Sequence, residues 1–472
     1  MNLNQKTRKP KMVDLERMCM SNPTFIEYYE NSKVPHVIMY KTTRFSMKMY
    51  FYEDGKVYEK HFMQNDKHHS TDGPAIIRYN EYGNIMQEIY YINGILHRED
   101  GPADIYYFLN GDDCEVKYYR HGNLHREDGP SDIKYFSPGL LYFEKYYVNG
   151  KEYNENGPSS IYYYKNGNIQ REIYSVCENM IERFNGCKPM SIAYYEDGTI
   201  SSERYLNTSG IKHRLDGPAY ISYYENGKIW YYEYYQNGVY HREDGPAVCS
   251  YYEDGEIKHE YYYLNGSLHR VDEPAKIYYY EDGVIKSEGY YLNNKIHRVG
   301  DPSYIHYFQN GNIKEIKYCV NGLPHNEDGP AYIKYFEGSD TKNISIMMYK
   351  INGIYQRNRE DGPAYIEYYE NGNIKYKAYF DENGIMNHPS KPSIISYFRN
   401  GMLKAEVYYV NDKIHCDHGP ANIIYYEDGT KKVTFYKKGF IHRMHGPSII
   451  EYTKDGKVSF ESYQTHSFNK YL

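Results

Sequence analysis

Hydrophobic and polar positions recur along this chain with a period of about 28 residues, and prolines mark the period. A fixed period of this size indicates an array of repeated supersecondary units. Residues 218–245, PAYISYYENGKIWYYEYYQNGVYHREDG, form one regular copy. The fourteen prolines of the series are Pro74, Pro102, Pro130, Pro158, Pro189, Pro218, Pro246, Pro274, Pro302, Pro330, Pro363, Pro392, Pro420 and Pro447.

Each copy alternates apolar and polar positions directly after its proline. The first position is Ala or Ser in every copy except at Met190, and the third is Ile in every copy except at Cys249. The fifth position is always Tyr. Because side chains alternate across a strand, these three positions share one face, which we expect to be buried. The sixth position points to the other side and is aromatic except at Asn80 and Thr453.

Glycines mark the turns of each copy. Gly follows Asn or Asp at the ninth position, as in Asn371-Gly372 and Asp254-Gly255, and a second Asn-Gly follows ten or eleven residues later, as at Asn265-Gly266. Such dipeptides between aromatic and β-branched segments predict hairpins with type I′ turns, in which both central residues have positive φ. Each period should therefore hold two strands and two hairpin turns, with no room for a helix.

A third landmark is the sequence His-Arg-x-Asp-Gly-Pro, complete for example at residues 241–246. Proline cannot donate to a strand ladder, and the glycine before it offers conformational freedom for a kink. We interpret the segment as a bend in the longer strand of each copy.

The pattern as a whole predicts an all-β fold, an elongated antiparallel β-meander built from about fourteen 28-residue hairpin repeats. We expect an N-terminal segment with a degenerate cap repeat over residues 1–45, the array over 46–456 and a C-terminal tail over 457–472. The cap repeat begins at Pro23 with PTFIEYYENS. The motif is worn around residues 184–188 and 339–343, where a kink or surface loop is expected.

Composition narrows the function classes. The 65 tyrosines among 472 residues must supply much of the core, and a net charge of -7 argues against nucleic-acid binding. The mean hydropathy is -0.86, and no apolar run is long enough for a membrane span. Residues 1–21 lack the apolar stretch of a signal peptide. These features predict a soluble, intracellular protein of the cytoplasm, with a host cell or a virion as further settings.

Ten histidines share one repeat position and could suggest metal binding. Equivalent residues lie two strands apart, about 9.6 Å, whereas zinc holds imidazole nitrogens at about 2.0 to 2.1 Å, so neighbouring copies cannot share one ion. We instead expect each ring to pack beside the bend and to bond the Asp three residues on. A collective response of the row to acid near pH 6 is a further hypothesis. The ten are His69, His97, His125, His213, His241, His269, His297, His325, His415 and His442.

Arginine follows most of these histidines and forms a ladder of positive charge. Acidic residues stand close behind, so the ladder predicts a solvated, self-neutralising edge, with a docking stripe for anionic lipid or an acidic partner as the alternative. The seven cysteines lack framework spacing, which indicates free thiols in a reducing compartment. We find no catalytic constellation, and we expect no enzyme activity, metal, cofactor or small-molecule substrate.

The string YYQNGVYHREDGPAVCSYYEDG at residues 234–255 resembles a MORN repeat (membrane occupation and recognition nexus) in its variant form. The resemblance extends over residues 46–460, with a period of 28 instead of about 23 and a bend opened by Arg-x-Asp-Gly-Pro. Arrays of this composition also resemble uncharacterised proteins of giant DNA viruses of amoebae. A looser similarity is to the tyrosine-rich YD repeats of bacterial toxin shells. The resemblance implies a hairpin array that acts as a scaffold or interaction protein, with membrane association possible.

The sequence therefore predicts a non-enzymatic repeat scaffold that binds a protein partner or its own copies through a Tyr-rich β face. A peripheral module that binds anionic lipids is the alternative. The aromatic sixth position is the candidate contact surface, or else it is covered by the twist of the ribbon. Its candidate residues are Phe108, Phe136, Tyr164, Tyr224, Tyr252, Tyr280, Phe308, Tyr369, Phe398 and Tyr426.

Overall fold

The computed structural model describes residues 23–175, 188–338, 343–356, 362–387 and 391–464. The chain divides into two compact units, Met1–Ile229 and Trp230–Leu472, which are treated separately below. Strands and turns make up the described ranges, where no helix is found and none could therefore cross a bilayer. The predicted all-β class is confirmed.

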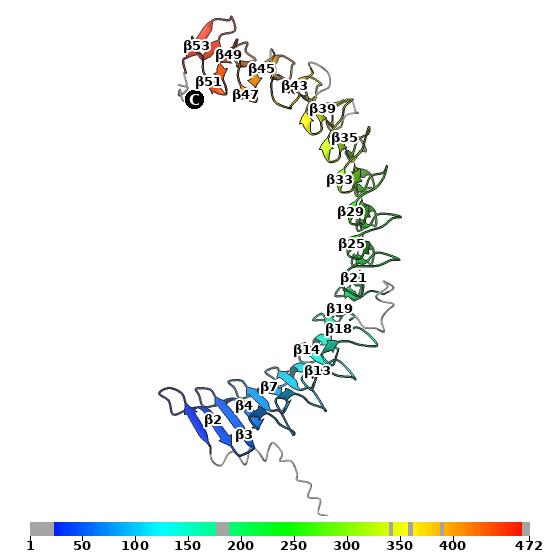
Figure 1. Cartoon of the computed structure of the whole chain (residues 1–472), viewed down its shortest axis with the longest axis vertical. Helices are drawn as coiled ribbons and strands as arrows, with labels where there is room; N and C mark the ends of the chain where they lie inside the picture. The colour runs from blue at the N-terminus through cyan, green and yellow to red at the C-terminus, as the bar shows by residue number, and fades with distance from the viewer. Residues whose placement is uncertain (1–22, 176–187, 339–342, 357–361, 388–390, 465–472) are drawn as a thin grey trace, which may run out of the picture. The chain divides into compact units, whose positions relative to one another are not determined.

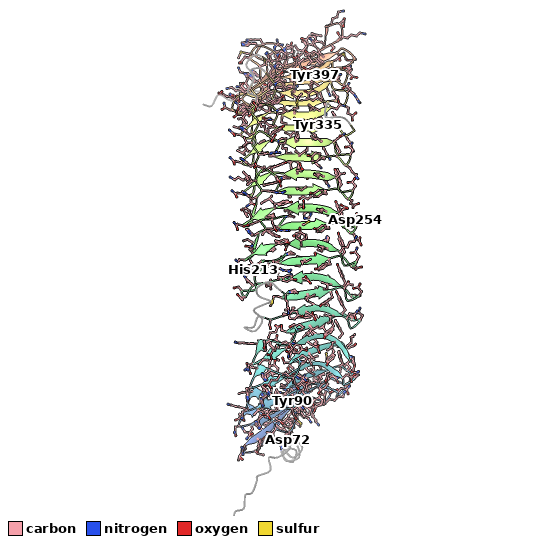
Figure 2. All side chains as sticks on the ribbon, turned by 90° about the vertical axis from the view of Figure 1, so that its right-hand side faces the viewer. Asp72, Tyr90, His213, Asp254, Tyr335 and Tyr397 are labelled. Carbon is pink, nitrogen blue, oxygen red and sulfur yellow. The ribbon has the colours of Figure 1, made fainter. Side chains whose placement is uncertain are left out.

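One copy of the second unit shows how a period folds. After Pro246, strands β26 (Val248–Tyr251) and β27 (Ile257–Tyr261) form a main hairpin, and β28 (Tyr263–Leu264) and β29 (Ser267–Leu268) form a small one. β27 also pairs with β30 (Lys276–Tyr279), the first strand of the next copy. Main hairpins thus join side by side into an antiparallel meander, in which successive strands lie as rungs with Asp254 at the turn side (Figure 2). The predicted meander of hairpin repeats is confirmed.

The predicted long second strand is in fact broken. Tyr262 separates β27 from β28, because its N–H donates to the carbonyl of Ala275 in the next copy while its carbonyl accepts from His269. A period with a small hairpin therefore has four strands in two hairpins instead of two strands, whereas the described residues of the copies after Pro189 and Pro363 form only the two main strands. The corner residue ties the main hairpin of one copy to the next copy and to its own small hairpin.

The first unit begins with longer strands than the rest of the array. These are β2 (Pro35–Lys41), β3 (Phe45–Phe51) and β4 (Val57–Gln64). The shorter β1 (Phe25–Tyr28) precedes them, and β5 (Lys67–His68) follows. β2, β3 and β4 pair side by side (Figure 1) around a core that includes Met47 and Phe62. The expected boundaries at residues 45 and 456 stay predictions.

After β5, each copy in the first unit contributes a first and a second main strand. They are β6 (Ile76–Tyr79), β7 (Ile85–Ile89), β10 (Asp104–Tyr107), β11 (Asp113–Lys117), β14 (Asp132–Ser137), β15 (Leu140–Lys145), β18 (Ser160–Tyr163), β19 (Ile169–Ile173), β20 (Ser191–Tyr194), β21 (Ile200–Arg204) and β22 (Tyr220–Tyr223). Its small hairpins are β8 (Tyr91–Ile92) with β9 (Ile95–Leu96), β12 (Tyr119–Arg120) with β13 (Asn123–Leu124), and β16 (Tyr147–Val148) with β17 (Lys151–Glu152).

The second unit has the same two kinds of hairpin. Its other main strands are β23 (Ile229–Glu233), β31 (Ile285–Gly289), β34 (Tyr304–Tyr307), β35 (Ile313–Lys317), β38 (Tyr332–Tyr335), β39 (Ile344–Met348), β42 (Tyr365–Tyr368), β43 (Ile374–Ala378), β44 (Ile394–Tyr397), β45 (Leu403–Val407), β48 (Asn422–Tyr425), β49 (Lys431–Thr434), β52 (Ile449–Tyr452) and β53 (Val458–Ser462). Its other small hairpins are β24 (Tyr235–Gln236) with β25 (Val239–Tyr240), β32 (Tyr291–Leu292) with β33 (Lys295–Ile296), β36 (Cys319–Val320) with β37 (Leu323–Pro324), β40 (Lys350–Ile351) with β41 (Ile354–Tyr355), β46 (Tyr409–Val410) with β47 (Lys413–Ile414), and β50 (Tyr436–Lys437) with β51 (Phe440–Ile441).

The core lies on the face predicted from positions one, three and five, which we call the core face. Position one has no room for more than a small side chain in most copies, since Ala103, Ala247 and Ser303 are 0% exposed. At position three, Ile105 and Ile133 are buried and are covered by tyrosine rings such as Tyr90 and Tyr107. Cys249, which replaces the core Ile, is buried as well. The predicted buried face is confirmed.

Glutamates within the core face are paired with tyrosine hydroxyls. In the second strand of most copies a Glu lies opposite the Ile of the next copy, as Glu260 does opposite Ile277. The position-five tyrosine of that next copy, Tyr279, donates to Glu260 Oε2 at 2.9 Å. The same bond joins Tyr107 to Glu88 at 2.9 Å and Tyr425 to Glu406 at 3.0 Å. These bonds satisfy a half-buried carboxylate that would otherwise destabilise the sheet.

The two turns of each copy differ in geometry. In the small hairpins both central residues have positive φ, for example 49° at Asn265 and 79° at Gly266, as a type I′ turn requires. In the main hairpins only the glycine does: Gly255 has a φ of 104°, while Asp254 accepts a bond from the backbone N–H of Glu256 with its side chain. The strand register also shifts at Ser250/Tyr251. The type I′ prediction is therefore confirmed for the small hairpins and wrong for the main ones.

Some sequence expectations fall on residues that the structure does not describe. The worn motif at 184–188 lies almost wholly outside the described residues, as do residues 339–342 of the second worn segment. Cys19, Cys177, Cys187 and Arg359 are outside them too. Of the described cysteines, Cys114, Cys249, Cys319 and Cys416 are free thiols.

We predict that the array unfolds at alkaline pH between about 10 and 12. Burial together with neighbouring glutamates raises the pKa of Tyr223, Tyr307 and Tyr425 to about 12. A pKa that is higher in the folded state stabilises the fold below the unfolded value near 10, and this stability is lost as pH rises through 12. The last part of the rise in tyrosinate absorbance should coincide with the loss of the circular dichroism signal of the sheet. Full tyrosine ionisation near pH 10 with the sheet intact would contradict the prediction.

Candidate interaction surface

Most of the ten aromatic residues predicted as a contact surface are half-buried, and four of the tyrosines among them bond the next copy. Tyr252 donates its hydroxyl to the carbonyl of Tyr279 at 3.0 Å, and Tyr280 donates to that of Tyr307 at 2.9 Å. Tyr164 and Tyr369 make the same bond to Tyr194 and Tyr397. The hydroxyls that were expected to face a partner are thus used inside the array.

The phenylalanines at this position have no such bond, and lysines cover two of them. Lys314 Nζ lies 5.5 Å from the ring centre of Phe308, and Lys404 Nζ lies 5.7 Å from that of Phe398. Phe108 and Tyr224 are half-buried, whereas Phe136 and Tyr426 are exposed. That these ten residues contact a partner stays a prediction.

The histidine row connects neighbouring small hairpins. His241 Nδ1 accepts a bond from the backbone N–H of Asn265, 24 residues on, at 3.1 Å, and the other ring nitrogen lies 3.7 Å from Glu243. The Nδ1 bond recurs at His69, His97, His125, His269, His297 and His325. An accepting Nδ1 implies that the neutral ring carries its proton on Nε2.

The expected bond from His to the Asp three residues on is wrong. That Asp bonds the arginine instead: Arg242 Nε donates to Asp244 Oδ1 at 2.8 Å. The reason is the alternation of an extended segment, in which residues two apart share a side. His241 therefore shares a side with Glu243, and Arg242 shares one with Asp244.

The arginine ladder closes the bend of each copy. The guanidinium of Arg242 lies 4.2 Å above the ring centre of Tyr234, and its Nη1 donates to the carbonyl of Pro246 at 3.3 Å. Arg98, Arg126, Arg214, Arg270, Arg298 and Arg443 make the same two contacts. The bond to the Arg242 guanidinium also holds the pKa of Asp244 below its usual range. These charges are engaged within the fold, in line with the self-neutralising edge that the sequence predicts.

The same contact explains the glycine before the proline. Gly245 does not have a positive φ, so the conformational freedom expected of it is not used. A Cβ built on Gly245 would instead lie 2.8 Å from Arg242 Cζ. Gly245 thus leaves room for the guanidinium, whereas the copies of Arg270 and Arg298 carry Glu273 and Asp301 at this position, and these acidic side chains form ion pairs with the arginine.

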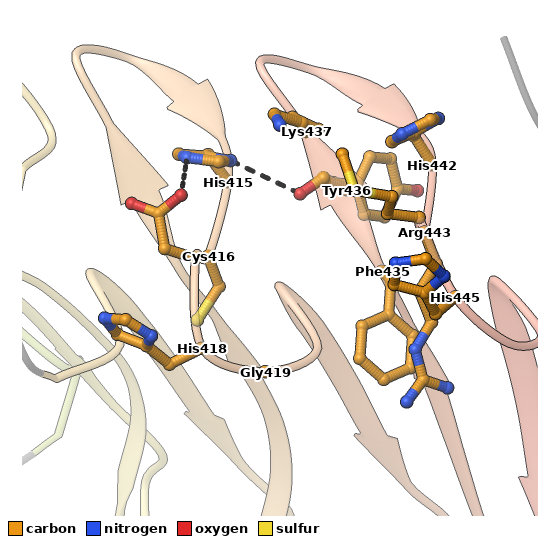
Figure 3. Close-up of a pocket in the computed structure, with 12 residues that line it drawn as sticks. His415, Cys416, His418, Gly419, Phe435, Tyr436, Lys437, His442, Arg443 and His445 are labelled. Atoms are coloured by element: carbon orange, nitrogen blue, oxygen red, sulfur yellow. Dashed lines mark hydrogen bonds and ion pairs between the residues drawn. The ribbon is translucent and has the colours of Figure 1, made fainter.

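A cleft of about 400 Å³ lies between two bends that depart from the motif (Figure 3). His418 and His445 replace the usual Asp, and His415 and His442 complete a set of four imidazoles. His415 is held by Asp417 at 3.1 Å and faces the Tyr436 carbonyl at 3.4 Å. Within the described ranges no three His, Cys, Asp or Glu side chains are placed to share a metal ion.

The other face of the main sheet, which we call the variable face, differs from copy to copy. It is built from positions two and four after each proline and from positions thirteen and fifteen, which pair with them across the strands. Positions two and four are Ile76 and Arg78, Asp104 and Tyr106, Asp132 and Lys134, Ser160 and Tyr162, Ser191 and Ala193, Tyr220 and Ser222, Val248 and Ser250, Lys276 and Tyr278, Tyr304 and His306, Tyr332 and Lys334, Tyr365 and Glu367, Ile394 and Ser396, Asn422 and Ile424, and Ile449 and Glu451.

Tyrosine, histidine and lysine interleave on the variable face of the second unit. Tyr261 donates to the Tyr278 hydroxyl at 2.7 Å, and Lys276 Nζ lies 4.8 and 5.2 Å from the centres of these two rings. His259 stacks on Tyr261 at 4.6 Å and shares a 2.6 Å bond with Ser250. Farther along, Lys317 Nζ lies 4.8 Å from the ring centre of Tyr304. The result is a partly covered aromatic surface with cationic groups.

Sequence reasoning missed this face because it followed what all copies share. The signal was present in the alternation itself, since positions two and four are the ones that vary while one, three and five do not. In a repeat array, the positions that are the same in every copy form the core. The positions that differ between copies lie where each copy can contact a partner.

We predict that Arg242→Ala destabilises the local bend by about 2 to 3 kcal/mol, since it removes a cation–π contact and two hydrogen bonds. Arg242→Asn should cost roughly half as much, about 1 to 1.5 kcal/mol, because one of the two hydrogen bonds can be kept. Asn154 and Asn326 occupy the arginine position naturally and donate to Pro158 and Pro330 at 2.9 and 3.1 Å. Hydrogen exchange at the amides of Tyr234 and Ala247 measures the difference. Equal effects of the two substitutions would contradict this role.

We also predict that the imidazole of His259 stays neutral down to about pH 5. Burial, with Lys258 and Lys276 nearby, lowers its pKa to about 4. A histidine pKa lowered on folding stabilises the fold above the unfolded value near 6.5, and this stability is lost as pH falls through 4. Titration of the ring protons by NMR tests the pKa, and His259→Gln should reduce the loss of stability between pH 6.5 and 4.

Comparisons with known proteins agree with the repeat. A family model described as "MORN repeat variant" matches residues 219–238, 247–268, 276–293, 364–384 and 394–411, and the second segment spans β26 to β29. No curated protein matches the chain. Among solved structures, a chain in "Crystal Structure of TcdB2-TccC3" is 9% identical with a TM-score of 0.11, over 90% of this chain and 28% of that one, so it carries no argument. The chain therefore contains MORN repeats of the variant type, arranged in tandem.

Proposed function

We propose that the chain is a non-enzymatic repeat scaffold that binds a protein partner, or further copies of itself, through the Tyr-rich variable face. One observation carries the proposal: the core face is the same in nearly every copy, while the variable face changes its tyrosines, lysines and acidic groups from copy to copy. Repeat arrays bind through such extended surfaces because each copy adds contacts of its own.

The chemistry of the variable face suits a protein surface. Tyrosine supplies a large, stiff contact area with a hydroxyl that can stay hydrated, and it is enriched in protein interfaces. Lys276 and Lys317 lie beside tyrosine rings, so carboxylates of a partner would find both charge and aromatic surface. The family that matches is a repeat, and the array repeats its side chains instead of building one asymmetric pocket.

Binding to anionic lipid is the competing function. Lipid binding would need a row of cationic side chains that are free to contact phosphate groups. The arginine ladder is the row that the sequence suggests for this role. Seven of its arginines lie on aromatic rings and donate to proline carbonyls, as Arg242 does, which leaves little of their charge for phosphate. The geometry thus favours the protein-binding function.

We predict that exchanging variable-face residues between copies removes partner binding while leaving the fold intact. Lys276→Val and Tyr278→Ser introduce the residues that the preceding copy carries at the same positions, Val248 and Ser250. Tyr261→Thr introduces the residue of Thr434, which pairs with Ile449 as Tyr261 pairs with Lys276. The matched control is Glu281→Lys, a charge change at an exposed turn. Proteins cross-linked to the wild-type chain in native extract should be lost from the triple variant and kept by the control.

Flotation with vesicles of phosphatidylserine and phosphatidylcholine tests the lipid function separately. We expect no flotation of the wild-type chain. Flotation that is lost on charge reversal of Arg242, Arg270 and Arg298, with no protein captured through the variable face, would replace the scaffold proposal by the membrane one.

A further inference from the structure

In the part of the chain that the structure describes, the two outermost main strands each have an edge with no paired strand. Among the described residues β1 pairs only with β2, and β53 pairs only with β52. Exposure is high on both: Tyr28 is 53% exposed on β1, and Phe460 is 51% exposed on β53. Neither strand contains the Lys or Pro that commonly protects an edge from pairing with another chain.

Inside the array, adjacent copies join by one rule. Positions thirteen, fourteen and fifteen of one copy pair with positions four, three and two of the next, as His259, Glu260 and Tyr261 pair with Tyr278, Ile277 and Lys276. The backbone N–H of position sixteen, Tyr262, donates to the carbonyl of position one, Ala275, at 2.8 Å. The same rule joins β43 to β44 and β45 to β48.

β1 has the sequence of a first strand, and no preceding strand pairs with it within the described ranges. Residues 23–31 differ from residues 363–371 only at Thr24 and Phe25, where the later copy has Ala364 and Tyr365. Position three of this copy, Ile26, is 37% exposed, whereas Ile366 is 7% exposed. Ile366 is less exposed because β39, the second strand of the preceding copy, pairs with β42 and covers it.

β53 has the sequence of a second strand, and no following strand pairs with it up to residue 464, where the description ends. Glu461 stands at position fourteen and already accepts the hydroxyl of Tyr463 at 3.4 Å, as Glu88 accepts that of Tyr90 at 3.4 Å. Inside the array such a glutamate also accepts from the position-five tyrosine of the next copy, as Glu88 does from Tyr107. Among the described residues Glu461 has no such second tyrosine.

We propose that copies of this chain join end to end, with β53 of one copy paired to β1 of the next. Phe460, Glu461 and Ser462 then pair with Glu27, Ile26 and Phe25 of the second copy. The N–H of Tyr463 donates to the Thr24 carbonyl, and the Tyr28 hydroxyl completes the glutamate pair. This contact uses strand edges and not the variable face, so it goes beyond the proposed function.

A second copy is the occupant that the residues specify. Each edge requires the partner strand that the other end of the same chain carries, with matching register, core residue and hydroxyl donor. The contact is head-to-tail, so it extends to rings or open chains of molecules instead of stopping at a symmetric dimer. The contact consists of only a few residue pairs on each side. We therefore expect a weak association that depends on the protein concentration.

Sedimentation velocity of the full chain over a hundredfold concentration range tests the proposal. We expect species in multiples of 56.1 kDa that grow with concentration. Tyr463→Pro removes the outward N–H, which donates to no backbone carbonyl among the described residues, and should weaken association at least tenfold. Tyr463→Ala keeps that N–H and should weaken it less.

Mixing two blocked variants distinguishes head-to-tail joining from every other mode. Ile26→Lys blocks β1 and leaves β53 intact, while Tyr463→Pro does the reverse. Each variant alone should be monomeric, and their mixture should form a dimer of twice 56.1 kDa, about 112 kDa, and nothing larger. Circular dichroism confirms that both variants are folded.

A wild-type chain that stays monomeric at every concentration, or an association that survives both substitutions, would overturn the proposal. The triple variant of the variable face should associate as the wild type does. If the triple variant loses partner binding but still associates, the two functions are separate. If the edge variants lose association but still bind the partner, they are separate as well, so failure of this inference can be told from failure of the proposed function.

Discussion

The lateral pairing of each second strand with the first strand of the following copy is the contact on which the structure depends. No copy buries its isoleucine alone: Ile277 lies between Glu288 of its own second strand and Glu260 of the preceding copy, which accepts a bond from Tyr279. Stability in such an array is a sum of nearest-neighbour terms. The bends, the arginine contacts and the histidine bonds all serve to hold successive copies at the spacing that this pairing requires.

The sequence predicts best those features that are local in the chain. Alternation over five residues identified the buried isoleucines, and the Asn-Gly dipeptides identified type I′ turns such as that at Asn265 and Gly266. The partners of polar side chains were harder to predict, since they lie a full copy away. The bond from Asn265 to His241 joins residues 24 apart, and the bond from Tyr252 to Tyr279 joins residues 27 apart.

Two glycines show that a turn or bend can be placed correctly from the sequence while the role of its glycine is not. Gly255 needs a positive φ, as expected of a turn residue. Gly245 has no positive φ, and the Arg242 guanidinium lies where a Cβ would be, although Glu273 and Asp301 occupy the same position in two other copies. Composition and spacing do not distinguish the two cases, since the distinction depends on where a long side chain folds back. The variable face was not predicted because the repeat pattern is defined by the residues that the copies share, whereas this face is built from the residues that differ.

The exact 28-residue offset between most bends has an evolutionary consequence. Removing residues 246–273 would place Pro274 directly after Gly245 and would bring the His241 ring to the backbone of Asn293, which now bonds His269 in the same way. Every junction would find an equivalent partner. Unequal recombination within the coding sequence can therefore lengthen or shorten such a protein one whole period at a time, without requiring any compensating substitution.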